Sequence, residues 1–149
     1  INKAKIQDNS LYFHVNLSKD VVGFQAKRNP IEKIDLFKVD YYNADDFWTP
    51  ITSKNREIVL NPGDFYLLSS KEKVKIPPEC AAEIDIYDTS IGEIRSHYAG
   101  FFDPGWGIVE GVHEGTAGVL EVRMRDVPMM TRDGQLFVKM IFEHMSSDR

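Results

Sequence analysis

Hydrophobic and polar residues alternate along most of the chain, and the clearest example lies near its start. Apolar residues occupy positions 11, 13, 15 and 17, and the residues between them are Tyr12, His14 and Asn16. A period of two places successive side chains on opposite faces of a strand. The segment is therefore predicted to be a strand with one buried face.

Comparable short runs recur through the rest of the sequence. They lie at residues 58–60, 65–68, 74–76, 83–87, 93–102, 119–124 and 135–142. Turn-forming sequences separate several of them, at residues 61–64, 77–78, 103–105 and 132–134. Many short strands punctuated by Gly, Pro, Asn and Asp are typical of an antiparallel sandwich or jelly roll. An all-β fold is expected.

Helical signals are confined to one short stretch. Residues 43–48 suit a turn or two of helix, with Asn43 in a position to cap it. The polar stretch at residues 18–38 is interpreted as hairpins and loops. No repeat or linker divides the chain, and 149 residues are close to the usual size of one compact domain. A single β domain with at most short helices is predicted.

Charge and cysteine content limit the kinds of partner and the cellular compartment that we expect. The 18 Lys and Arg against 23 Asp and Glu give a net charge of -5, which argues against a nucleic-acid groove. Cys80 has no second cysteine to pair with, and no apolar run approaches the roughly 18 residues of a membrane span. A reducing, aqueous, cytoplasmic location is expected. Because the sequence starts at Ile1 without a leader, we expect it to begin inside a longer chain.

Several catalytic chemistries lack the residues they need. A zinc-dependent nucleobase deaminase requires cysteine ligands in a PCxxC segment, and the chain has one cysteine. Its four histidines have no HExxH-like spacing, so no metal site is expected. The sequence also contains no GxGxxG, Walker loop or GxSxG motif, so no tightly bound cofactor and no such nucleophile are predicted.

The stretch at residues 90–107 combines several chemically useful side chains. If residues 95–103 form one strand, Arg95, His97, Ala99, Phe101 and Asp103 share a face. One interpretation is an ordinary solvated face that ends in a type I turn. The other is a pocket lining.

The run at 119–124 adds a carboxylate to this region. Its even positions are apolar, and its other side carries Val119, Glu121 and Arg123. Glu121 is either a cross-strand ion-pair partner or, if the face lines a pocket, a general base.

Three segments together resemble a known family. They are AGFFDPGW at 99–106, VLEV at 119–122 and DGQ at 133–135, and the similarity extends back through residues 41–50 and 60–66. The sequence resembles the dCTP deaminase branch of the dUTPase-like superfamily. It is most similar to the second half of the long form, in which two related halves share one chain. The resemblance implies a dUTPase-like β jelly roll or distorted β-barrel.

The resemblance also implies a reaction and a set of roles. Glu121 matches the glutamate that activates water for attack on C4 of the cytosine ring, with no metal at the base. Asp103 matches the ligand of the deoxyribose 3′-hydroxyl, Ala99 the backbone contact to the pyrimidine, and Trp106 part of the sugar wall. Magnesium would arrive with the substrate triphosphate.

The chain departs from the short form of the family at two places. In the short form, a Ser is followed four residues later by a phosphate-binding Arg. In this chain Ser90 is followed at that spacing by Ile94, and Arg95 comes one place later. The connection between Asp103 and Glu121 is also longer. Arg95, with His97 as a helper, is the cationic group that the proposed face offers to phosphates. We therefore expect a related N-terminal half or other subunits of a homo-oligomer to complete the site.

Two alternative functions remain at this point. One is a nucleotide pyrophosphatase of the same superfamily, in which Asp103 would orient water against the α-phosphate. The other is a non-catalytic nucleotide-binding or regulatory β domain, whose polar face is simply surface.

Overall fold

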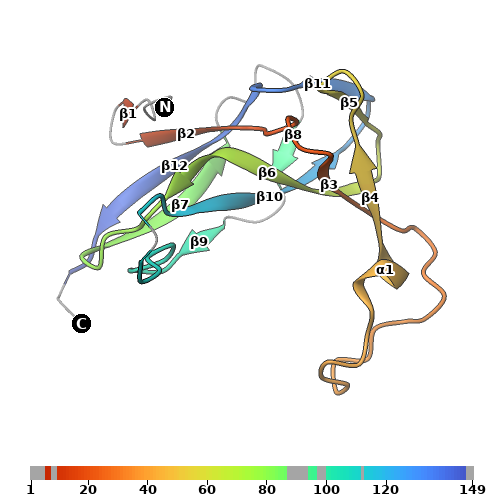
Figure 1. Ribbon diagram of the computed structural model, residues 1–149, viewed down its shortest axis with the longest axis horizontal. Helices are drawn as coiled ribbons and strands as arrows, with labels where there is room; N and C mark the ends of the chain where they lie inside the picture. The colour runs from red at the N-terminus through yellow and green to blue at the C-terminus, as the bar shows by residue number, and fades with distance from the viewer. Residues whose placement is uncertain (1–5, 8–9, 87–93, 97–99, 112, 147–149) are drawn as a thin grey trace.

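The computed structural model describes residues 6–7, 10–86, 94–96, 100–111 and 113–146, and these residues are mainly strands (Figure 1). Their one helix, α1 (Ala44–Phe47), begins after Asn43, whose side-chain oxygen accepts a hydrogen bond from the amide of Asp45 at 3.1 Å. The all-β prediction and the short capped helix are confirmed. No helix in the described part of the chain has the length and apolar character needed to cross a bilayer.

The first described sheet joins strands from both ends of the sequence. Its strand order is β1-β2-β12-β7-β9, and every neighbouring pair is antiparallel. The strands are β1 (Ile6–Gln7), β2 (Ser10–His14), β12 (Leu136–His144), β7 (Cys80–Ile86) and β9 (Phe101–Phe102).

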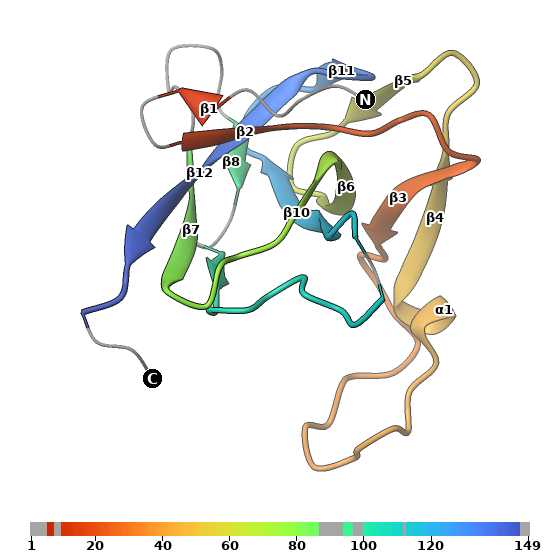
Figure 2. The same ribbon diagram turned by 60° about the vertical axis from the view of Figure 1, so that its left-hand side comes forward.

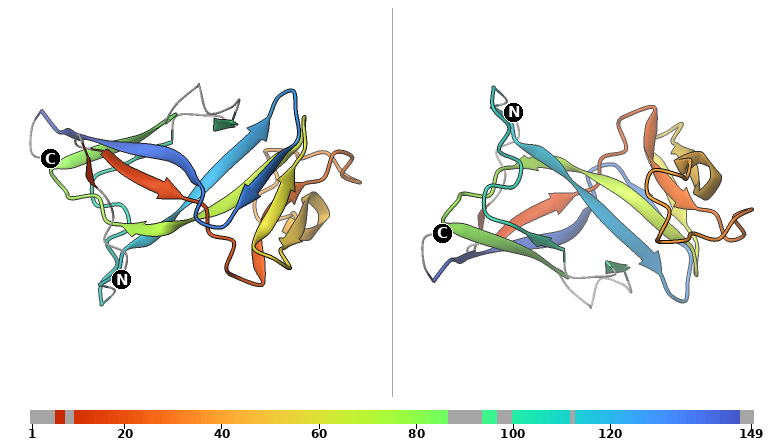
Figure 3. Two further views of the ribbon diagram at one scale, coloured as in Figure 1. Left: turned by 90° about the horizontal axis from the view of Figure 1, so that it is seen from above. Right: turned by 90° about the horizontal axis from the view of Figure 1, so that it is seen from below.

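The second described sheet has the order β4-β3-β6-β10-β8 and is also antiparallel. Its strands are β4 (Trp48–Thr52), β3 (Val21–Ala26), β6 (Phe65–Val74), β10 (Thr116–Met124) and β8 (Ile94–Ser96). A small ribbon pairs β5 (Glu57–Leu60) with β11 (Met129–Arg132). Figure 3 shows β6 and β10 crossing obliquely to β2 and β12.

The hydrophobic core is formed by the alternating residues that the sequence pattern identifies. Phe13 and Val15 at the β2 end, Leu68 on β6 and Val122 on β10 are almost completely buried. An isolated bridge between Val15 and Ser70 joins the end of β2 to β6 and so ties the two sheets together. The core therefore lies between the sheets, as expected for a sandwich or distorted barrel.

Residues 93–102 do not form one strand, so that expectation is wrong. Within this segment, β8 pairs with β10 in the second sheet and β9 pairs with β7 in the first. β8 is an edge strand of the second sheet and β9 is an edge strand of the first, so Ser96 and Phe101 lie in different sheets. Arg95 and Asp103 consequently do not belong to one strand face.

The interpretation of residues 18–38 as hairpins and loops is also incomplete, because β3 lies within them. The strand was hidden by an irregularity in its pairing with β4, between Val21 and Gly23, which breaks the alternation of apolar and polar residues. At Gly23 the backbone of β6 approaches closely, and a Cβ there would lie 2.4 Å from the carbonyl oxygen of Leu67. Glycine thus permits this strand contact.

Candidate active site

Glu121 lies near the middle of β10 on its outward face. Leu120 and Val122, the residues on either side of it, are buried at 2% and 1% exposure, whereas Glu121 is exposed. The expected division of the two faces of this strand is therefore confirmed. Among the described residues, the Glu121 carboxylate forms no ion pair and no side-chain hydrogen bond. Its oxygens are available to water or to a ligand.

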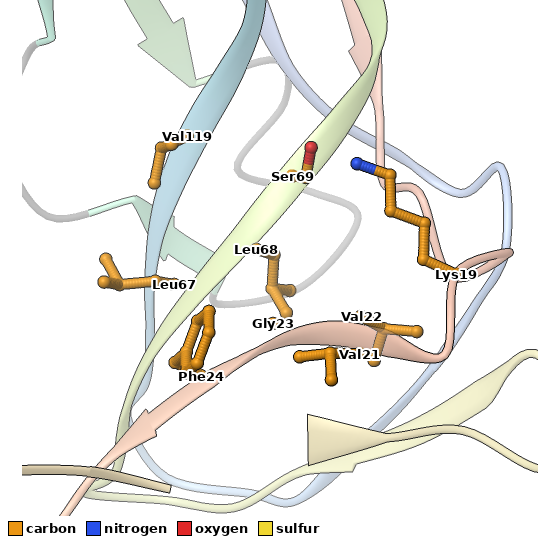
Figure 4. Close-up of a pocket in the computed structure, with 9 residues that line it drawn as sticks. All are labelled: Lys19, Val21, Val22, Gly23, Phe24, Leu67, Leu68, Ser69 and Val119. Carbon is orange, nitrogen blue, oxygen red and sulfur yellow. The ribbon is translucent and has the colours of Figure 1, made fainter. Parts of the chain in front are cut away.

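An apolar row runs across the second sheet from Glu121. Leu67 on β6 is the register partner of Glu121, and Phe24 on β3 is the register partner of Leu67. Leu67 and Phe24, together with Val119, line a pocket of about 310 Å³ on this face. Figure 4 shows Phe24, Leu67 and Val119 at the left of the pocket and Lys19 at its right. The carboxylate therefore stands beside an apolar surface.

Sequence reasoning missed this pocket, although a signal was present. Val119 on β10 and Leu67 on β6 are apolar residues at outward positions, where the alternating pattern predicts polar ones. Val119 is 62% exposed. Several outward apolar residues on neighbouring strands, here Val119, Leu67 and Phe24, form a continuous apolar surface of the kind that marks a binding site.

Arg123 lies on the same outward face as Glu121, two residues further along β10. Its guanidinium carbon is 5.2 Å from the centre of the Phe65 ring, and that ring is 5.9 Å from the Trp48 ring. Phe65 is the register partner of Arg123 on β6, so the guanidinium is held over a residue of the neighbouring strand. Arg95 on β8 is the register partner of Arg123, so two arginine positions lie side by side, one on the strand of Glu121 and one on the neighbouring strand.

Asp103 and Trp106 belong to a turn that follows β9 in the other sheet. The amide of Trp106 donates to the backbone carbonyl of Asp103 at 3.0 Å, and Gly105 adopts a left-handed conformation at φ 84. The Trp106 ring packs edge-on against the Phe102 ring at 4.7 Å, and its side chain is only partly exposed. The Asp103 side chain is exposed. Packing of Trp106 thus fixes the turn that carries Asp103.

The structure brings some of the expected site residues together and separates others. Glu121 and the backbone of Arg95 lie in the second sheet on neighbouring strands. Asp103 and Trp106 follow the edge strand of the first sheet. Ala99 and His97 lie outside the described residues. No hydrogen bond or ion pair among the described residues connects Glu121 with Asp103.

Comparison with known proteins places these features in context. Residues 1–149 match the model of the family described as 2′-deoxycytidine 5′-triphosphate deaminase (DCD), C-terminal domain. A relative from Methanosphaera stadtmanae, named dCTP deaminase, dUMP-forming, is 27% identical over 150 residues, which cover 98% of this chain and 69% of the relative. A Natronomonas pharaonis protein named dCTP deaminase is 31% identical over 96 residues, which cover 62% of this chain and 47% of that protein.

A solved structure is similar over nearly the whole chain. The crystal structure of 2′-deoxycytidine 5′-triphosphate deaminase from Agrobacterium tumefaciens matches with a TM-score of 0.87 and 34% identity over 99% of this chain. The chain spans only 44% of that protein. The similarity in fold and sequence therefore includes β10 and the turn after β9. More than half of the solved relative has no counterpart in residues 1–149.

Proposed function

Since the chain belongs to the family of 2′-deoxycytidine 5′-triphosphate deaminase C-terminal domains, we propose that it forms part of an enzyme that deaminates dCTP by hydrolysis. The observation that carries this proposal is the match of all 149 residues to that family. The geometry supports it as well, because an exposed carboxylate stands beside an apolar pocket on the second sheet.

Glu121 is the proposed general base. Water adds to C4 of the cytosine ring, the bond from C4 to the exocyclic nitrogen breaks, and dCTP and water become dUTP and ammonia. Glu121 accepts a proton from the attacking water, and the same carboxyl group can deliver a proton to the departing amino nitrogen. This role requires no metal at the base. The free outward position of Glu121 beside Leu67 supports the assignment.

The remaining candidate residues would hold the substrate. Asp103 would bind the deoxyribose 3′-hydroxyl, Ala99 would offer backbone groups to the pyrimidine, and Trp106 would shape the wall around the sugar. Arg95 and His97 would face the phosphates, whose magnesium ion arrives as part of the substrate. The fixed turn at residues 103–106 and the position of Arg95 opposite Arg123 support these roles.

Another domain or subunit would complete the site. Glu121 is exposed, and Asp103 follows a strand of the other sheet, so the described residues leave the reacting carboxylate open to water. Catalytic groups work best where bulk water is excluded and the substrate is held on several sides. A related half of a longer chain, or further copies in a homo-oligomer, would supply the missing wall.

Product analysis tests the proposed reaction. The full-length protein is incubated with dCTP and Mg²⁺, nucleotides are separated by ion-exchange chromatography, and ammonia is measured in parallel. Equal amounts of dUTP and ammonia are expected. Formation of dUMP, pyrophosphate and ammonia would instead match the reaction named for the Methanosphaera stadtmanae relative. Pyrophosphate release without ammonia would overturn the proposal in favour of a pyrophosphatase, and absence of turnover would favour a binding domain.

A further inference from the structure

A loop between β3 and α1 projects from the body of the molecule and carries apolar residues into solvent. We call residues 27–43 the arm; Figures 1 and 2 show it extending beyond the β3–β4 pair. Four of its side chains are at least 80% exposed: Ile31 at 97%, Phe37 at 96%, Leu36 at 89% and Val39 at 80%. Scattered exposed apolar residues are ordinary, but four on one projecting loop form a patch of the kind found at interfaces.

The arm is held in a defined shape by its own hydrogen bonds. The Tyr42 hydroxyl accepts from the amide of Asp35 at 2.6 Å and donates to the carbonyl of Lys33 at 3.3 Å. The Asp35 side chain accepts from the amide of Phe37 at 3.0 Å. Lys38 lies over the Tyr41 ring at 4.4 Å. These contacts order the backbone while leaving the apolar side chains outside.

Two contacts at the N-terminal end of the arm hold its base. The amide of Lys27 donates to the carbonyl of Phe47 at 2.8 Å. Arg28 pairs with Asp64 at 2.6 Å, and the Asp64 side chain is only 5% exposed. A fixed base and an ordered tip reduce the conformational entropy lost when the arm binds a partner. The arm is therefore suited to docking.

We propose that the arm docks onto a second domain of the same polypeptide, of the kind that makes up the rest of the longer family chains. The solved relative supplies a candidate occupant, because the compared residues span only 44% of its chain. One loop offers much less surface than the roughly 20–30 residues a side that a stable complex of free partners buries. A tethered domain needs less surface, because its effective concentration is of millimolar order.

The charges on the arm favour a protein surface as its partner. Among the apolar residues lie three acidic and two basic side chains: Glu32, Asp35, Asp40, Lys33 and Lys38. Lys27 and Arg28 lie at the base of the arm, and Arg28 is paired with Asp64. Nucleic acids and anionic membranes attract clusters of Lys and Arg, and this mixture offers neither of them a positive patch. Apolar side chains surrounded by charges of both signs resemble the centre and rim of a protein interface.

Limited proteolysis of the full-length protein tests the proposal. Trypsin cleaves after Lys33 and Lys38, which lie among the exposed apolar residues of the arm, and the exposed Lys54 in the loop between β4 and β5 is an internal reference. We expect cleavage after Lys33 and after Lys38 to be at least about 10-fold slower than at Lys54. The double variant Leu36→Ser/Phe37→Ser should remove this protection, whereas Val127→Ser, at an exposed apolar site outside the arm, should preserve it. Arm cleavage as fast as that at Lys54 in the unsubstituted protein would overturn the proposal.

Photo-crosslinking identifies what the arm touches. A benzoylphenylalanine at position 37 of the full-length protein is expected to form a crosslink within one polypeptide, mapped by mass spectrometry to a residue outside 1–149. The same group at position 127 is the control. Crosslinks between two copies, crosslinks within residues 1–149 only, or no crosslink would each overturn the proposal. Deamination of dCTP is measured separately, so docking and the proposed activity succeed or fail independently.

Discussion

At the scale of single residues, Glu121 carries the proposed proton transfer. Glu121→Gln keeps the size of the side chain and removes its basicity. We expect kcat for dCTP deamination by the full-length protein to fall by at least about 10²-fold, with a small change in affinity for the nucleotide. Steady-state kinetics measure both. Glu143→Gln, at an exposed position of β12 in the other sheet, is the matched control and should retain activity. Turnover of Glu121→Gln within a few-fold of the parent would remove this residue from the mechanism.

Asp133 is a second residue with a testable charge, and its role is structural. Its carboxylate accepts from the amide of Leu17 at 2.8 Å and pairs with Lys71 at 2.8 Å and Arg56 at 3.9 Å. Burial opposes ionisation, but the hydrogen bonds from Lys71 and Leu17 and the neighbouring positive charges together hold the pKa of Asp133 below its usual value. The ionised form therefore stabilises the turn between β11 and β12 against the end of β2.

The sign of the pH dependence follows from this lowered pKa. The stabilisation is fully present above the unfolded-state value of about 3.9 and is lost as the pH falls through the lower folded-state pKa. Asp133→Asn should reduce the free energy of unfolding at pH 7 by about 1–3 kcal/mol. Its difference from the parent should shrink below about pH 4. Urea unfolding from pH 7 to pH 2 measures this, and Asp126→Asn in an exposed loop is the control. A difference that stays constant with pH would contradict the charge assignment.

At the scale of elements, Gly23 controls how closely β3 packs on β6. A Cβ at this position would lie 2.4 Å from the Leu67 carbonyl oxygen and 2.7 Å from a methyl group of Leu68. Gly23→Ala must push the strands apart, and we expect the free energy of unfolding to fall by about 1–3 kcal/mol. In Gly100→Ala the new methyl would meet its nearest atom at 3.5 Å, an ordinary contact. Urea unfolding of the two variants compares them, and equal stabilities would contradict the close-packing argument.

The elements also show which parts of the fold local sequence can predict. Alternation correctly places Leu120 and Val122 in the core and Glu121 outside, because a regular strand with one buried face has a period of two. Around Gly23 the pairing irregularity breaks this period, and the strand is missed. Arg95 and Asp103 do not share a strand face, because β8 pairs with β10 in one sheet and β9 pairs with β7 in the other. These pairings join segments distant in sequence, so a local pattern cannot predict them. The outward position of Glu121 was therefore easier to predict than the arrangement of the residues around it.

At the scale of the whole molecule, we expect phosphate binding to differ between residues 1–149 and the full-length protein. A triphosphate carries close to four negative charges, and several cations or amides must converge on it. The net charge of this chain is -5, and the Arg123 guanidinium is already held over Phe65. We expect residues 1–149 alone to bind dCTP at least about 10²-fold more weakly than the full-length protein, with little turnover.

Calorimetric titration of both proteins in the same salt and Mg²⁺ measures this difference. Circular dichroism of the isolated chain serves as the control for its folding. If a folded isolated chain matched the full-length protein in affinity and deamination rate, residues 1–149 would contain the complete site and the shared-site proposal would be abandoned.

The pairing of β2 with β12 has a consequence for how this protein is made. These strands lie side by side in the sheet, yet residues 10–14 and 136–144 are separated by most of the sequence. During synthesis, β2 leaves the ribosome long before its partner exists, and Leu11 and Phe13 have no completed core to enter. Such distant pairing slows folding, typically to milliseconds or seconds, and leaves an apolar strand open to aggregation meanwhile. The nascent chain should therefore depend on chaperones until β12 has emerged.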